Sequence, residues 1–139
     1  MFVAALGNNS VEVIDIGART RVHSITGIPN PQGVVYAPET RNLRPVSKGQ
    51  LYIYDAATLE LVKAIEFHGD VDNLRYDVPN QRVYVGFGDD ETGAIGSVDA
   101  TRMLALTKTP TWTAKVHPAN LMVASEGDQI WTVRGCAIG

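Results

Sequence analysis

The sequence is poor in the residues that several classes of protein need. Its 139 residues include one cysteine, Cys136, so no internal disulfide framework is possible. No apolar run approaches the ~18 residues of a membrane span. The apolar stretch Met1–Leu6 has no basic leader and stops at Gly7, which is typical of a strand rather than of a secretion signal. We therefore expect neither a membrane span nor a signal peptide in this chain.

The sequence also has no large excess of charge of either sign. Twelve lysines and arginines face fifteen aspartates and glutamates, so the net charge is −3 and the pI is about 5.5. This balance provides no bulk attraction to nucleic acid or to an anionic membrane, and a nucleic-acid partner is not indicated. With 45% hydrophobic residues, the composition is that of one folded domain.

Sequence signatures of common catalytic sites are absent too. There is no Gly-x-Ser-x-Gly, no His-Glu-x-x-His and no Walker loop. The histidines His23, His68 and His117 are isolated and do not have the spacing of zinc ligands. These absences favour a protein that is not an enzyme, and we predict no cofactor from them.

What the sequence does contain is a repeat of about forty residues. Tyr36 and Tyr76 are 40 residues apart, and so are Asp15 and Asp55. Asp99 follows 44 residues later because the loop 88–93 is longer. Units of this length, each with four short strands, are the signature of a β-propeller.

Each repeat contains short segments rich in Val, Ile, Leu and Tyr, which favour strands, and no stretch of 10–12 residues has helical periodicity. We name the strands of each repeat a to d in chain order. Strand a is predicted at Gly33–Ala37, Asn73–Asp77 and Trp112–Val116; strand b at Phe2–Ala5, Leu43–Val46, Val83–Phe87 and Leu121–Ser125; strand c at Val11–Ile14, Leu51–Tyr54, Ile95–Val98 and Ile130–Val133; strand d at Arg21–Thr26, Leu61–Phe67 and Met103–Lys108.

We therefore predict an all-β, propeller-like fold of four-stranded antiparallel blades, about 3.5 blades in all, without significant helix. The single partial propeller 1–139 divides into blade 1 (strands b–d, 2–27), blade 2 (33–67), blade 3 (73–108) and blade 4 (strands a–c, 112–134). Pro45 removes a ladder donor and should shorten or bulge its strand. Because half a ring leaves open sheet edges, we expect either the remaining blades of a longer chain or a homo-oligomer.

The repeat resembles the YVTN-type β-propeller repeat family. The similar stretches are Phe2–Asp15, Pro31–Pro38, Val83–Gly88 and Leu121–Ser125. The resemblance implies a propeller that binds a ligand or protein, and a periplasmic or extracytoplasmic location for full-length relatives. It also implies an alternative, because such repeats are similar to the propellers of quinoprotein dehydrogenases and of lyases.

An aspartate ends three of the predicted c strands: Asp15, Asp55 and Asp99. A carboxylate at this place can accept backbone N–H groups of the turn that follows, as in an Asx-turn. We therefore interpret these three residues as structural turn residues rather than as catalytic ones.

The predicted loops differ in charge between the two ends of the blades. The loops between strands b and c and between d and a hold seven carboxylates and one lysine, whereas the other loops are mildly basic. In propellers ligands bind at the first of these ends, and carboxylates suit Ca²⁺, although Asp89-Asp-Glu91 lacks the alternating spacing of a calcium loop. The candidate binding residues there are Asn8, Asn9, His68, Asp70, Asp72, Asp89 and Asp90.

Two functions follow for this acidic end. The first is a non-catalytic binding scaffold for a cation or for a basic or polyhydroxylated ligand. The alternative is part of a quinoprotein-dehydrogenase-like or lyase-like enzyme, for which His68, Asp70 and Asp72 form the one local cluster. A third interpretation is that these charges only keep the loops soluble.

Overall fold

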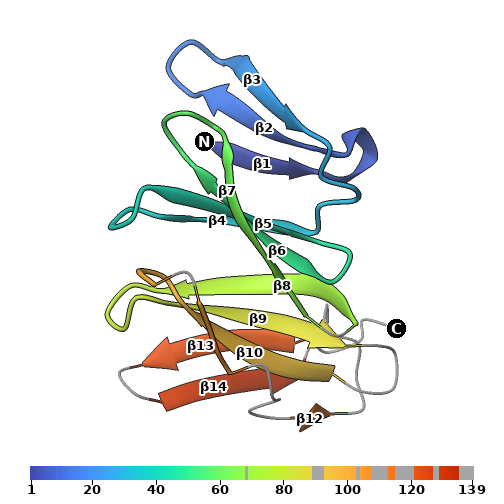
Figure 1. The fold of residues 1–139 in the computed structure, drawn as a ribbon, viewed down its shortest axis with the longest axis vertical. Coiled ribbons are helices and arrows are strands. Elements are labelled where there is room, and N and C mark those ends of the chain that lie inside the picture. The colour runs from blue at the N-terminus through green and yellow to red at the C-terminus, as the bar shows by residue number, and fades with distance from the viewer. Residues whose placement is uncertain are drawn as a thin grey trace.

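The computed structural model describes residues 1–67, 69–88, 93–102, 104–107, 113–114, 121–126 and 129–134, with side chains described in the first three ranges. Apart from one short 3₁₀ turn, η1 (Leu6–Asn8), every described element is a strand. The strands form antiparallel sheets that follow one another along the long axis of the molecule (Figure 1). The prediction of an all-β fold with antiparallel blades is confirmed.

Blade 1 has the order β1-β2-β3, and blade 2 has the order β4-β5-β6-β7. Blade 3 has the order β8-β9-β10-β11, and β13 pairs with β14 in the last sheet. The strands are β1 (Phe2–Ala5), β2 (Ser10–Asp15), β3 (Thr20–Thr26), β4 (Gly33–Ala37), β5 (Asn42–Ser47), β6 (Gln50–Asp55), β7 (Leu61–Glu66), β8 (Asp70–Asp77), β9 (Arg82–Gly88), β10 (Gly93–Asp99), β11 (Leu104–Thr107), β12 (Thr113–Ala114), β13 (Leu121–Glu126) and β14 (Gln129–Arg134).

Two strands differ from the expected arrangement. We expected a strand a at Asn73–Asp77, but β8 begins earlier, at Asp70, and carries a register irregularity between Val71 and Asn73. We also expected 112–116 to begin blade 4. The described part of that range, β12, instead pairs with Gly93 and Ala94 of β10 in blade 3.

The expectation that Pro45 shortens or bulges its strand is wrong. β5 has six residues, and its register with β4 is unbroken. Its pairing with β6 skips Arg44 and Pro45 and then resumes in the same register. The two-residue turn Lys48–Gly49, with φ of 42° and 77°, is of the kind that sets hairpin register, so the strand survives the loss of one N–H donor.

The core consists of apolar side chains between successive sheets. Val11, Ile25, Ile28, Leu43 and Tyr54 pack between blades 1 and 2. A second cluster packs between blades 2 and 3: Val46, Leu51, Ile53, Ile65, Phe67, Val71, Leu74, Val83, Val85, Phe87, Ala94 and Val98. Blade 2 contributes to both clusters because successive side chains of a strand point to opposite faces. This explains why its central strands lack the polar alternation of a half-exposed sheet.

Three glycines bring loops of neighbouring blades into close contact. Gly69, with φ of +88°, lies where an added Cβ would be 2.7 Å from the carbonyl oxygen of Gly88. An added Cβ on Gly49 would be 2.9 Å from the carbonyl oxygen of Gly69. These backbones can approach only because no side chain separates them.

We therefore predict that Gly69→Ala is more destabilising than Gly27→Ala. Gly27 has a similar φ of +81° but nothing within 4 Å of its added Cβ, so its replacement isolates the cost of the backbone conformation. We expect Gly27→Ala to lower the unfolding free energy by about 1 kcal/mol and Gly69→Ala by about 3 kcal/mol. Urea denaturation followed by circular dichroism measures both, and equal losses would contradict the close approach of Gly69 to Gly88.

Candidate functional site

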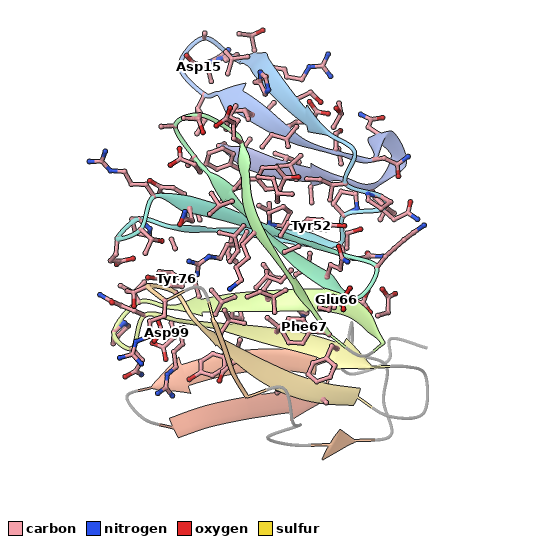
Figure 2. The ribbon with its side chains drawn as sticks, viewed as in Figure 1. Asp15, Tyr52, Glu66, Phe67, Tyr76 and Asp99 are labelled. Carbon is pink, nitrogen blue, oxygen red and sulfur yellow. The ribbon has the colours of Figure 1, made fainter. Side chains whose placement is uncertain are left out.

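The turns of the described blades sort into two ends. The turns between strands a and b and between c and d lie at one end, and those between b and c and between d and a lie at the other (Figure 1). In Figure 2, Asp15, Tyr76 and Asp99 lie toward the first end and Glu66 toward the second. We call them the a–b/c–d end and the b–c/d–a end.

At the a–b/c–d end, three aspartates organise the turns after strand c. The Oδ1 atom of Asp15 accepts a hydrogen bond from the N–H of Ala18 at 3.0 Å. Oδ1 of Asp55 accepts from the backbone of residues 57 and 58, at 2.8 and 2.9 Å. Oδ1 of Asp99 accepts from residues 101 and 102, both at 2.8 Å. In all three blades the side chain thus completes the turn.

A register irregularity accompanies each of these aspartates. It falls between Val13 and Ile14, between Ile53 and Tyr54, and between residues 97 and 98, so each lies just before its aspartate. Backbone hydrogen bonds from Thr58 and Ala57 lower the pKa of Asp55, and the bond from Arg102 does the same to the pKa of Asp99. The repeat therefore specifies one local motif, a register irregularity followed by an aspartate turn.

At the b–c/d–a end, Asn8 and Asn9 follow β1. Asn8 is exposed at the end of η1, and Asn9 has a left-handed φ of 53°. The Oδ1 atom of Asn9 accepts the N–H of Asn30 at 2.9 Å, and its carbonyl accepts the N–H of Ile28 at 3.3 Å. Asn9 thus holds the connection between blades 1 and 2, whereas Asn8 is available at the surface.

The connection 27–32 is held from blade 2 as well. The N–H of Gln32 donates to the carbonyl of Val46 at 3.0 Å, and the hydroxyl of Ser47 donates to the carbonyl of Pro29. Pro29 and Pro31 restrict its backbone further. This connection is therefore bonded to both neighbouring blades, through Asn9 of blade 1 and through the end of β5 in blade 2.

The acidic candidates lie at the start of blade 3. Asp70 is exposed, and its Oδ1 atom accepts the N–H of Val71 at 3.0 Å. Asp72 is half-buried at the irregularity of β8, and its carbonyl lies 3.7 Å from the position of an added Cβ on Gly33. His68, Asp89 and Asp90 lie outside the described residues. The structure thus places the asparagines on blade 1 and the aspartates on blade 3, at the same end of the molecule.

Within the part of the chain that the structure describes, no group of three His, Cys, Asp or Glu side chains could hold a metal ion. Among the same residues, no helix is long and apolar enough to cross a membrane. Among the described residues of the b–c/d–a end, the candidate groups exposed at the surface are therefore the amide of Asn8 and the carboxylate of Asp70.

The structure also reveals a buried guanidinium that the sequence interpretation missed. Arg44 in β5 is fully buried. Its Nη2 atom donates to the carbonyl of Ala100 at 2.5 Å and to the hydroxyl of Thr40 at 3.4 Å, whereas Nε and Nη1 have no partner in the part of the chain that the structure describes. Burial lowers the pKa of Arg44, but a guanidinium stays protonated in proteins. The sequence does mark Arg44 as unusual, because the corresponding positions one repeat before and one repeat after hold Ala4 and Tyr84, which carry no charge.

Tyr76 lies close to this guanidinium and joins blades 2 and 3. Its hydroxyl donates to Oε2 of Glu39, in the a–b turn of blade 2. Partial burial and this hydrogen bond raise the pKa of Tyr76 to about 12, and the same bond lowers the pKa of Glu39. The phenol therefore stays neutral at physiological pH and has a structural role between the blades.

Comparisons with known proteins agree with this architecture. No protein-family model and no curated protein sequence matches the chain. Among solved structures, the WD40 repeats of RRP9 share 13% identity at a TM-score of 0.65, with 76% of this chain and 33% of that chain covered. Sqt1 of Saccharomyces cerevisiae shares 10% identity at a TM-score of 0.68, with 92% of this chain and 37% of that chain covered.

A chain of the mitotic checkpoint complex is similar as well, with 19% identity, a TM-score of 0.66, and coverage of 91% of this chain and 38% of that chain. WD40 repeats form β-propellers. The chain has a β-propeller fold. At these identities the likeness concerns the fold alone, and the chain spans between a third and two fifths of the length of these three propellers.

The aspartate turns of this propeller should depend on pH. Asp55 has a folded pKa below its ordinary value of 3.8, so its contribution to stability is complete above about pH 4 and is lost as the pH falls through the lowered folded value. We expect Asp55→Ala to lower the melting temperature at neutral pH by a few degrees. Asp55→Asn keeps an acceptor and should lose less.

Thermal melts of the three proteins between about pH 2 and pH 7 provide the measurement. The difference in melting temperature between the wild type and Asp55→Asn should shrink as the wild-type carboxylate becomes protonated. A difference that stays constant down to about pH 2 would argue against a lowered pKa for Asp55.

A second prediction concerns the buried Arg44. Among the described residues, two of its nitrogens lack partners and no carboxylate is paired with it, so an apolar side chain of similar length should replace it at little cost. We expect Arg44→Met to change the unfolding free energy by no more than about 1 kcal/mol. Arg44→Ala, which also leaves a cavity, should lower it by about 2 kcal/mol or more. Chemical denaturation measures both, and a large loss in Arg44→Met would reveal a compensating partner.

Proposed function

We propose that this chain supplies YVTN-type blades to a propeller that acts as a non-catalytic binding scaffold, with the b–c/d–a end as its binding surface. The observation that carries the proposal is the connection 27–32. Its backbone forms hydrogen bonds with Asn9 of blade 1 and with Val46 and Ser47 of blade 2. A surface whose loops are already held loses less conformational entropy when it binds a partner.

The partner that fits this end best is a basic segment of a protein. With the loop boundaries predicted from the sequence, the loops of the b–c/d–a end contain seven carboxylates and one lysine, Lys48. Among the described residues, Asp70 and Glu66 are exposed there, and Asn8 adds an exposed amide. Clustered negative charge on a rigid surface attracts a positively charged partner and orients it during association.

The similar structures support an interaction role by analogy only. One of them is a chain of the mitotic checkpoint complex, so that propeller works within an assembly of proteins. For this chain we further propose that other blades, either of a longer polypeptide or of a second copy, continue the ring. The binding surface would then extend over more blades than the described ones.

A charged peptide provides the test. We would measure by fluorescence anisotropy how the full chain binds a labelled peptide of alternating lysine and glycine, with a peptide of alternating glutamate and glycine as control. We expect binding of the lysine peptide alone, weakened as salt is raised. Asp70→Asn should weaken it about two- to fivefold, which is the size of one exposed ion pair.

The matched control is Glu60→Gln, because Glu60 is an exposed carboxylate in the c–d turn at the opposite end. It should leave the affinity for the lysine peptide unchanged. Equal effects of Asp70→Asn and Glu60→Gln would indicate attraction to net charge only. Equal binding of both peptides would also be incompatible with a basic partner at the b–c/d–a end.

A further inference from the structure

Large aliphatic side chains that blades 2 and 3 expose to solvent gather at one end of the molecule. Among the residues whose side chains the structure describes, Leu61 is 53% exposed, Val62 is 50% exposed and Val78 is 54% exposed. Leu61 and Val62 begin β7, directly after the c–d turn of blade 2, and Val78 lies in the a–b turn of blade 3. All three therefore belong to the a–b/c–d end, opposite the end proposed for binding.

The exposure of Val62 belongs to its position in the repeat. Val22 lies 40 residues before Val62 and is 58% exposed. Each of the two valines is the one residue of its strand d that has no partner on strand c, because the register shifts at that point. Val62 stays exposed although blades 1 and 3 both pack on blade 2. The register irregularity therefore leaves a valine at the surface in two successive blades.

The turns at this end are joined to one another by hydrogen bonds. In blades 2 and 3 the N–H of the residue after the turn aspartate donates to a carbonyl of the a–b turn, at 2.9 Å to Arg41 and at 2.8 Å to Gln81. Between these blades, the hydroxyl of Tyr76 donates to the carboxylate of Glu39. The a–b and c–d turns of blades 2 and 3 therefore form one connected surface, which loses little conformational entropy when a partner covers it.

Charges of both signs surround these aliphatic side chains. The exposed and half-exposed charged residues of this end in blades 2 and 3 are the cations Arg41, Lys63, Arg82 and Arg102 and the carboxylates Glu39, Asp55, Glu60 and Asp99. The two signs are present in equal number, so this surface carries no net charge. Two copies of it do not repel each other, whereas two copies of the acidic b–c/d–a end do.

We propose that two copies of this chain associate through their a–b/c–d ends, related by a twofold axis. In such an interface both copies contribute the same surface, so the surface must be complementary to itself. Equal numbers of cations and carboxylates meet this requirement, because each charge on one copy can face the opposite charge on the other. Burial of Leu61, Val62 and Val78 from both copies provides the hydrophobic stabilisation.

This association goes beyond the proposed function, because it uses the opposite end of the molecule and a different partner. It leaves the acidic b–c/d–a end of each copy facing outward. The pair therefore presents two acidic ends on opposite sides, and each can bind a basic segment without interfering with the other. Dimer formation and peptide binding are then separate properties that can be measured on the same variants.

Sedimentation of the full chain between about 1 and 200 µM provides the test. As the concentration rises, we expect the mass to approach twice the 15.0 kDa of one chain. Val62→Lys replaces an apolar contact and adds a cation to each copy, so it should raise the dissociation constant of the dimer about tenfold or more. Val78→Lys lies in a turn of the same surface and should have the same effect. Circular dichroism checks that both variants fold.

Leu6→Lys is the matched control, because Leu6 is 48% exposed at the b–c/d–a end, and it should leave the dimer intact. Val3→Lys tests association through blade 1, where Val3 is 39% exposed, and should also leave the dimer intact. Binding of the lysine peptide should differ by no more than about twofold between the wild type and Val62→Lys.

A chain that stays monomeric at every concentration would overturn the proposal. So would a dimer that persists in both Val62→Lys and Val78→Lys, or one that only Val3→Lys dissociates. None of these results would affect the proposed binding of a basic segment, which the peptide measurement tests by itself.

Discussion

Burial of the central strands on both faces is the constraint on which the rest of this propeller depends. All six residues of β5 are buried. Leu43 packs toward blade 1 and Val46 toward blade 3, so blade 2 is stabilised by the two blades that flank it. A strand in this position has no exposed face for a polar side chain. The guanidinium of Arg44 therefore donates to the carbonyl of Ala100, on the next blade, and two of its nitrogens lack partners among the described residues.

The aspartate turns stabilise a different feature, the ends of the hairpins between strands c and d. Each hairpin has its register irregularity immediately before the aspartate, which then bonds to the N–H groups that follow it. These contacts span two or three residues and recur in three blades. They bring the turns to one end of the molecule and leave the b–c and d–a connections to form the other.

The two ends therefore differ in how they are held. At the a–b/c–d end the aspartates stabilise the turns within their own blades, and Tyr76 and Arg44 add hydrogen bonds between blades 2 and 3. At the b–c/d–a end, Asn9, Ser47 and the close approach of Gly69 to Gly88 join loops of different blades. The exposed side chains of Asn8 and Asp70 lie at this end of the molecule.

The sequence by itself determined the strands, the repeat and the turns after Asp15, Asp55 and Asp99, because these depend on contacts between residues close in the chain. The tertiary structure alone decided the burial of Arg44, the role of Asn9, the intact strand around Pro45 and the pairing of β12 with β10. Arg44 and Ala100 are 56 residues apart, and Asn9 and Asn30 are 21 apart. No local pattern encodes such distances, since they depend on how one sheet packs on the next.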